Sequence, residues 1–353
     1  MELKTIDLRY ISRGSSEAES DVVLAVIDEE SIDKEGKWIW PRSKMANLVK
    51  KLSEAGARVI SFDIGFLEPD EKSVVRAIED IEKNLTFLDV ENRTYLAELK
   101  RSSDNDQLLA DAIAESKAKV VLGYFFQMEK LHSGDFDEAL LKIQNKNIQS
   151  SRYVQVKFQS ENALEVPLIE AQVANANITA ISQATPYSGF FNMFPDKDGV
   201  VRWIPAVIDY EDEMYAPLSL MTLSAFKDSQ PLVVVAEYGV EKIQFDDITI
   251  PTDELGRIMI NYRGDAKSFK HIPVTDILSG KVPESELKGK AVIVGATAIG
   301  IYDMRVTPFT SVFPGVEIHA SIVDSVLREA FLYHPTWAAV FDVLAIVLVG
   351  ILL

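Results

Sequence analysis

The chain contains no cysteine, which excludes disulfide bonds, thiolate catalysis and cysteine-bound metal ions. It also lacks the metal-hydrolase motif HExxH, the hydrolase motif GxSxG and the phosphate-binding motif GxxxxGK[ST]. Its four histidines are scattered along the sequence and form no spaced set of metal ligands. The sequence therefore presents no recognisable catalytic centre, and we predict no catalytic residue and no cofactor.

Positive charge is scarce in this chain, which has 36 lysines and arginines against 54 aspartates and glutamates and a net charge of −18. A protein that binds duplex nucleic acid needs a basic stripe to neutralise phosphates, and no such stripe is present. We therefore predict no nucleic-acid partner. The acidic residues are spread along the chain, which is typical of a solvated surface rather than of an acidic tail.

Apolar residues are abundant, at 47% of 353 residues, and are sufficient for a large core. Short apolar runs at residues 22–27, 58–62, 120–126 and 291–294 are rich in β-branched residues and predict strands buried on both faces. Helical periodicity separates them, which favours parallel pairing with right-handed crossovers. We predict an α/β fold with a mixed, largely parallel sheet, flanking helices and inserted β-hairpins.

The hairpins are expected beyond residue 171, where short extended pieces replace the long runs. Asp198-Gly199 lies between two such pieces and is a hairpin signal, and a second hairpin is expected between residues 207–210 and 214–215. Residues 129–160 are polar and irregular, and we predict that they form a surface insertion. We describe the first 14 residues only as a mixed segment.

The last stretch of the sequence, residues 337–353, is almost entirely apolar and carries a single charge at Asp342. A membrane-spanning helix needs about 20 apolar residues, and Trp337 is suited to the interface between membrane and water. We expect one domain over residues 1–334 and the start of a truncated transmembrane helix over residues 335–353. The alternative is a buried terminal helix.

Acidic residues follow three of the predicted strands, as Asp28, Asp63 and, after a loop, Asp303. Ligands of open α/β sheets bind beyond the carboxyl ends of the strands, so converging carboxylates would bind a hard cation or accept hydrogen bonds from a ligand. The alternative is that each one caps a helix or pairs with an arginine. We add Thr297 to this candidate ligand site, with its metal content unknown.

Two further features have a functional and a structural interpretation. Trp38 and Trp40 can line the rim of a pocket or pack against the neighbouring helix. The small residues from Gly295 to Gly300 can cradle a phosphate or allow close packing, and we favour packing. We expect His319, on the last core-facing helix, to be a satisfied structural residue.

Several stretches together resemble the type-2 CHASE domain (cyclases/histidine kinases associated sensory extracellular domain). They occur in this order over nearly the whole chain up to about residue 332: LKTIDLRY (3–10), VIDEES (26–31), WIWPR (38–42), FDIGF (62–66), EPD (68–70), VVLG (120–123), NMFPDKDGVVR (192–202), NYRG (261–264), LKGK (287–290), GATA (295–298), TP (307–308) and PGVEIHA (314–320).

The resemblance implies an extracytoplasmic sensor held between an upstream transmembrane helix and downstream membrane helices. Such sensors precede a cytoplasmic output, most often a class III adenylate cyclase and otherwise a histidine kinase or diguanylate cyclase. It implies an inner-membrane location with residues 1–334 outside the cytoplasm, and it supplies no binding residues. We expect as partners the membrane, through the C-terminal helix, a small-molecule or protein stimulus of unknown identity, and a second copy in a homodimer.

Two other classes of function stay open from the residues alone. One is a structural module that sets receptor dimerisation without a ligand. The other is a soluble Mg²⁺-dependent α/β hydrolase or phosphotransferase, which the absence of a nucleophile–base pair disfavours.

Overall fold

The computed structural model describes residues 2–16, 20–84, 89–129, 138–160, 166–301, 304–332 and 338–352. Its centre is a sheet whose strand order is β14-β1-β15-β2-β3-β5, with β6 also paired to β3. Every pairing is parallel except that of β5 with β3. The strands are β1 (Val22–Ile27), β2 (Val59–Phe62), β3 (Lys119–Gln127), β5 (Val173–Asn175), β6 (Ser188–Phe190), β14 (His271–Pro273) and β15 (Ala291–Ala296).

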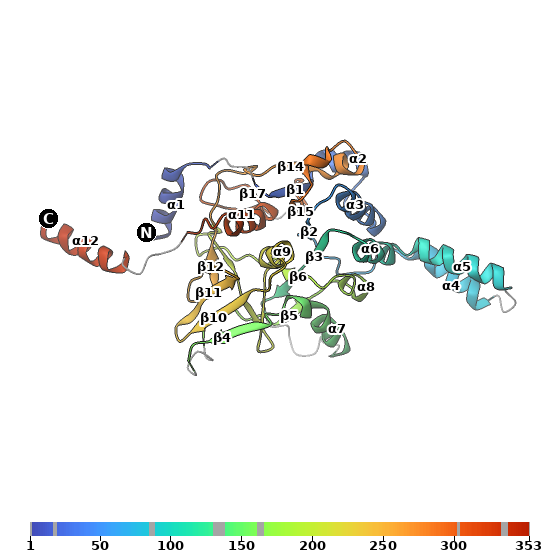
Figure 1. Ribbon diagram of the computed structural model, residues 1–353, viewed down its shortest axis with the longest axis horizontal. Helices are drawn as coiled ribbons and strands as arrows, with labels where there is room; N and C mark the ends of the chain where they lie inside the picture. The colour runs from blue at the N-terminus through green and yellow to red at the C-terminus, as the bar shows by residue number, and fades with distance from the viewer. Residues whose placement is uncertain are drawn as a thin grey trace.

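Helices cover both faces of this sheet, as Figure 1 shows. Val23, Ala25 and Ile27 of β1 pack toward one set of helices, whereas Val22 and Leu24 pack toward the other. This alternation follows from the two-residue period of a strand. The first set is α2 (Glu29–Glu35), α3 (Arg42–Glu54), α6 (Asn105–Ala114), α8 (Thr179–Ser182) and α10 (Val274–Leu278), and the second is α9 (Leu218–Lys227) and α11 (Gly315–Leu327).

A second sheet shares the core of α9 and α11, with the strand order β12-β11-β10-β4. Three short antiparallel pairs complete the β structure: β7 with β13, β8 with β9, and β16 with β17. The strands are β4 (Gln155–Phe158), β7 (Trp203–Pro205), β8 (Ile208–Tyr210), β9 (Glu213–Tyr215), β10 (Leu232–Ala236), β11 (Gly239–Phe245), β12 (Ile248–Pro251), β13 (Arg257–Met259), β16 (Met304–Arg305) and β17 (Phe313–Pro314).

The four strands predicted from apolar runs are confirmed, and so is the mixed, largely parallel α/β architecture. The predicted hairpin at residues 207–215 is β8–β9. The hairpin predicted at Asp198-Gly199 is wrong, because β7 pairs with the distant β13 instead. The mixed segment at the start is a helix, α1 (Glu2–Arg13).

The described part of the predicted insertion has regular structure. It contains α7 (Glu138–Ile148), a short 3₁₀ helix (Gln149–Ser151) and β4, and β4 joins the second sheet beside β10. Ile148 and Ser151 are fully buried, so this segment contributes to the core. Asn145 and Asn147 reach other parts of the chain through hydrogen bonds.

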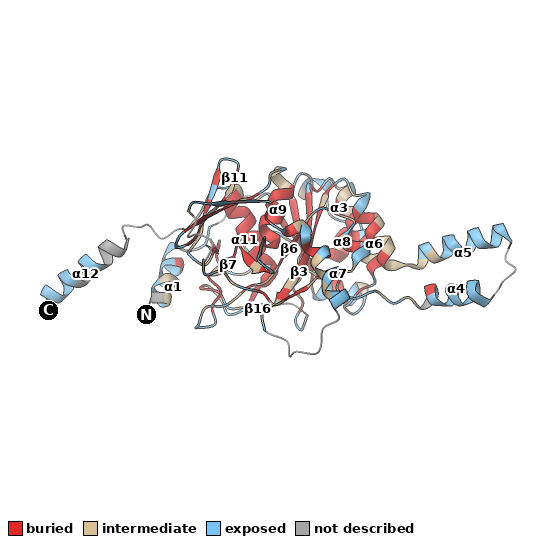
Figure 2. Ribbon diagram, turned by 90° about the horizontal axis from the view of Figure 1, so that it is seen from below, coloured by how far each residue is buried: buried red, intermediate tan, exposed pale blue. Residues whose placement is uncertain are grey.

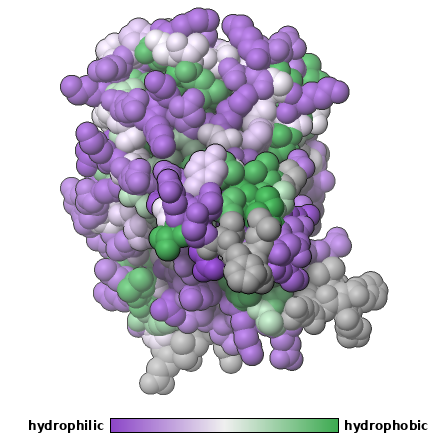
Figure 3. Space-filling model, turned by 90° about the vertical axis from the view of Figure 1, so that its right-hand side faces the viewer, coloured by the Kyte–Doolittle hydropathy of each residue, from purple (hydrophilic) through white to green (hydrophobic). Residues whose placement is uncertain are grey.

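Two helices project from the body as a hairpin, α4 (Ser73–Asn84) and α5 (Val90–Ser103) (Figures 1 and 2). Figure 2 shows their surfaces as mostly exposed. Figure 3 views this end of the molecule, where a hydrophobic area interrupts a mostly hydrophilic face. Exposed apolar residues of the two helices include Val74, Ile81, Val90 and Tyr95.

The C-terminal helix α12 (Ala338–Leu352) has 15 residues and extends away from the body on the same side as α1 (Figures 1 and 2). Among the described residues, no helix is both long enough and apolar enough to cross a membrane. The predicted transmembrane helix is therefore not supported by the described part of the chain. Trp337, its predicted interfacial residue, lies outside that part.

Candidate functional site

The carboxyl edge of the central sheet carries three of the predicted site residues. Asp28, Thr297 and Asp63 follow β1, β15 and β2, which are neighbours in the sheet. Parallel strands bring their carboxyl ends to one edge, as the sequence argument assumes. Asp303 lies outside the described residues, so its predicted place beside them is not tested.

Asp28 has a structural role at this edge. Its side chain accepts a hydrogen bond of 2.9 Å from the backbone N–H of Ser31 and caps α2. The loop after β15 is held by backbone bonds, since the N–H of Thr297 donates to the carbonyl of Ile27. The N–H of Ile299 donates to a carboxylate oxygen of Glu29 at 2.7 Å. The capping alternative therefore describes Asp28.

Asp63 lies beside His319 of α11. Its Oδ1 lies 3.8 Å from Nε2 of His319, which is too far for a hydrogen bond. His319 is 1% exposed, and neither ring nitrogen has a hydrogen-bond partner among the described residues. Burial, and then the charge of Arg305, lower the pKa of His319 to about 3. The expectation for His319 is therefore right about burial and wrong about satisfied hydrogen bonds.

Close packing explains Gly295, the first of the small residues, which lies near the end of β15. A Cβ on Gly295 would lie 2.6 Å from Cγ2 of Val316 on α11, so only glycine lets the helix approach the strand this closely. This contact confirms the packing interpretation at Gly295.

The two tryptophans differ in burial. Trp40 is 2% exposed, donates from Nε1 to the carbonyl of Gly36 at 2.7 Å, and has the amine of Lys44 over its ring. Trp38 is half-buried and meets Trp40 edge-on, with 5.5 Å between ring centroids. Both rings pack with the core of α3, as the packing alternative expects.

No group of three or more histidine, aspartate or glutamate side chains is placed to hold a metal ion within the described ranges. The strand-end carboxylates Asp28 and Asp63 are engaged in different directions, one at α2 and one beside α11. The described residues of the predicted site therefore follow neighbouring strands of the sheet, and their binding of a ligand stays a prediction.

A second polar centre, which the sequence reasoning missed, joins α1 to the body. Arg202 is completely buried and binds three aspartates. It forms bidentate pairs with Asp7 of α1 at 2.8 Å and with Asp198 at 2.9 Å, and it also contacts Asp196 at 2.8 Å. These bonds lower the pKa of Asp198 well below its usual range. The Asp198-Gly199 turn thus positions carboxylates around an arginine.

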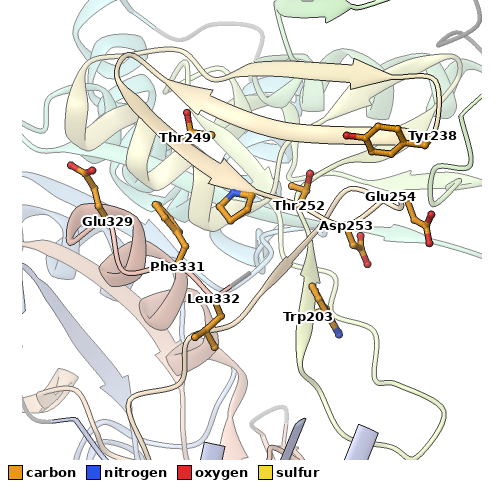
Figure 4. A pocket seen from close by; sticks show the side chains of 10 residues that line it. Trp203, Tyr238, Thr249, Thr252, Asp253, Glu254, Glu329, Phe331 and Leu332 are labelled. Atoms are coloured by element: carbon orange, nitrogen blue, oxygen red, sulfur yellow. The ribbon is translucent and has the colours of Figure 1, made fainter. Parts of the chain in front are cut away.

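A groove of about 680 Å³ lies at the other side of the body from the projecting hairpin, where the chain leaves α11 toward α12 (Figures 1 and 4). Its walls come from β7, the β10–β11 turn, β12 with the following loop, and residues 329–332. Its aromatic and acidic residues are Trp203, Tyr238, Phe331, Asp253, Glu254 and Glu329.

One glycine brings two walls of the groove together. Gly239 has a φ of 144°, and a Cβ there would lie 2.0 Å from the carbonyl oxygen of Glu254. The N–H of Val240 donates to the same carbonyl. Only glycine therefore allows the loop after β12 to cross the start of β11 next to Tyr238.

The groove escaped sequence reasoning because its residues come from four distant segments. Phe331 lies in a stretch that matched no motif, and Tyr238 stands in a two-residue turn. Trp203 directly follows the stretch NMFPDKDGVVR, which ends at Arg202. That stretch was therefore the sequence feature closest to a residue of the groove.

Comparison with known families identifies the class of protein. The family described as CHASE2 domain matches residues 1–352, and the chain therefore belongs to the CHASE2 domain family. CHASE2 domains are extracellular sensory modules of signalling receptors. No curated protein and no solved structure matches the chain.

Proposed function

We propose that the chain is the extracytoplasmic sensory domain of a bacterial transmembrane receptor that passes a stimulus through membrane helices to a cytoplasmic output. The observation that carries this proposal is the family match over residues 1–352. A class III adenylate cyclase is the proposed output, and a histidine kinase or diguanylate cyclase is the alternative. The proposed location is the inner membrane, with residues 1–334 on the outer side.

The arrangement of the chain ends supports this proposal. α1 and α12 lie on the same side of the body in both ribbon views (Figures 1 and 2). The pairs of Arg202 with Asp7 and the bond from the Tyr10 hydroxyl to the carbonyl of Ile260 fix α1 to the residues next to β7 and β13. A change in the body would therefore be transmitted to α1 as a rigid element.

The proposed output is tested by expressing the full-length protein in bacterial cells that lack their own adenylate cyclase. We expect cyclic AMP to accumulate and Arg202→Ala to change its amount, because that variant removes the charged pairs between Asp7 of α1 and the body. Arg101→Ala, which removes an arginine paired with Asp111 at the surface, is the matched control and should have no effect. No cyclic AMP from a stably expressed protein would exclude the cyclase output.

A second candidate function is a dimerisation module that needs no ligand. The exposed apolar residues Val74, Ile81 and Val90 on the projecting hairpin favour it, because a second copy would bury them. Sedimentation of the 353-residue chain and of Val90→Glu measures this directly. A dimer that dissociates in the variant supports the module, whereas a monomer in both excludes dimerisation through the hairpin.

A further inference from the structure

The groove between β7, β12 and residues 329–332 combines aromatic rings with carboxylates and is large enough for a small ligand. Its volume of about 680 Å³ lies within the range of about 300–1,000 Å³ that ligand pockets occupy. We propose that this groove binds a small organic cation, a quaternary ammonium that carries an alkyl or aromatic group.

The aromatic residues supply the first argument. Trp203, Tyr238 and Phe331 line the groove from three different segments (Figure 4). The face of an aromatic ring carries negative charge density and attracts cations. Trp203 already holds one cation in this way, because the guanidinium carbon of Arg257 lies 5.3 Å from its ring centroid. An ammonium group in the groove would meet the same kind of surface.

The charges supply the second argument. Asp253 is neutralised by Arg257, with 2.7 Å between oxygen and nitrogen. Glu254 and Glu329 form no ion pair with any described residue. Of the described residues that line the groove, none is a lysine or an arginine. Two uncompensated carboxylates favour a cation and disfavour phosphates, carboxylates and other anions.

The lining also decides between an organic cation and a metal ion. A bare divalent ion needs several converging oxygen ligands, and the described residues contain no such cluster. Pro251, Leu332 and the aromatic rings instead provide apolar surface for a hydrocarbon body. Figure 4 shows the side chains of Phe331 and Leu332 opposite β12, the strand that carries Thr249.

The position of the groove gives binding a consequence. Residues 329–332 connect α11 to the segment that leads to α12, whereas Thr249 and Pro251 belong to the second sheet. A bound cation would bridge these two parts and favour one arrangement of residues 329–332 relative to the second sheet. This consequence rests on the proposed sensory function, but the binding itself does not.

Isothermal titration calorimetry on the purified 353-residue chain tests the proposal with charged compounds and their uncharged or anionic counterparts. The first pair has nearly the same shape. Choline carries a permanent positive charge, and 3,3-dimethyl-1-butanol is its neutral counterpart. Benzyltrimethylammonium adds an aromatic body, and benzenesulfonate is the anionic comparison. We expect both ammonium compounds to bind, benzyltrimethylammonium more tightly, and the neutral and anionic compounds to bind at least about threefold more weakly.

Variants locate the site. Tyr238 is 60% exposed and Glu254 and Glu329 are also exposed, so Tyr238→Ala and the double variant Glu254→Gln/Glu329→Gln should fold normally. Each variant should weaken the binding of benzyltrimethylammonium about three- to tenfold. Glu98→Gln on α5 is the matched control and should bind unchanged.

Equal affinity for charged and neutral probes, no binding at all, or full affinity in both groove variants would overturn the proposal. Each of these results concerns the ligand alone. The side of the membrane on which the domain lies is measured separately, so a failure of the ligand assignment can be distinguished from a failure of the sensory function.

Discussion

Two buried polar groups differ in whether they carry a charge. One is Arg202, which with Asp7, Asp196 and Asp198 forms the N-terminal anchor of α1, and the other is His319 beside the carboxyl edge of the central sheet. At the anchor, Arg202 is surrounded by three aspartates and every partner lies within 2.9 Å. At the sheet edge, His319 is equally buried, but its nitrogens have no hydrogen-bond partner among the described residues. The first centre stays charged through its partners, and the second avoids charge by remaining neutral.

The two groups therefore differ in their effect on stability: the paired Arg202 holds a fixed geometry, whereas the stability contribution of His319 depends on its protonation. A charge-paired arginine holds fixed geometry, because removing either partner leaves an unpaired charge inside the protein. A neutral histidine with unsatisfied nitrogens costs free energy in the folded state and gains from any group that satisfies it. The predictions that follow test this contrast.

The largest effect is expected at the anchor. Arg202→Ala removes the buried cation that three carboxylates share, and only the exposed Lys4 remains near two of them. The variant should lower the free energy of unfolding by about 3–5 kcal/mol. Urea denaturation of the 353-residue chain measures this. Arg101→Ala at the exposed pair with Asp111 should cost less than about 1 kcal/mol. Equal losses in the two variants would contradict the special role of the buried centre.

The second effect is on how the free energy of unfolding depends on pH. The folded-state pKa of His319 is lowered to about 3, below the value of about 6.5 for an unfolded chain. The unfolded state therefore binds more protons, and stability falls as pH falls between these two values, by at most about 1.4 kcal/mol per pH unit. His319→Leu should remove this slope. An unchanged slope in the variant would assign the acid sensitivity to other groups.

The anchor has its own acid response in a lower window. Because the pKa of Asp198 is lowered by its hydrogen bonds to Arg202, its contribution is present above the unfolded value of about 4 and is lost below it. Asp198→Asn should therefore reduce the loss of stability below about pH 4 without changing the slope near neutral pH. Unfolding at stepped pH values separates the two windows.

The smallest effect is expected at a single neutral bond of the anchor. Tyr10→Phe removes the hydroxyl that donates to the buried carbonyl of Ile260 at 2.6 Å. The expected loss is about 1 kcal/mol, with hydrogen exchange in α1 accelerated more than in α11. A loss spread evenly over both helices would indicate that α1 is not held separately.

Local pattern predicted the central sheet because its strands are continuous apolar runs and its helices repeat at helical spacing. The end of α3 illustrates this, since Gly56, two residues after the last helical residue, adopts a φ of 79°, the left-handed conformation in which glycine commonly ends a helix. The parallel arrangement followed from the alternation of strands and helices. These features are encoded in neighbouring residues.

Contacts between distant residues were not predictable in the same way. α1 is fixed by bonds from Arg13 to Asn261 and to the carbonyl of Tyr262. β7 pairs with β13 rather than within the expected hairpin. The sequence predicted that Asp28 and Asp63 follow the ends of strands. It did not predict that Asp28 would cap α2 or that Asp63 would lie beside His319 of α11. The groove depends on four segments that only the fold brings together.

The most direct measurement of the account's central claim is the side of the membrane on which this domain lies. This chain has no cysteine, and Val154, which lies outside the projecting hairpin, is 75% exposed, so Val154→Cys in the full-length protein introduces one accessible thiol within the domain. A membrane-impermeant maleimide should label the variant, but not its parent, in intact cells. Labelling that occurs only after the cells are lysed would place the domain in the cytoplasm and contradict the sensory proposal.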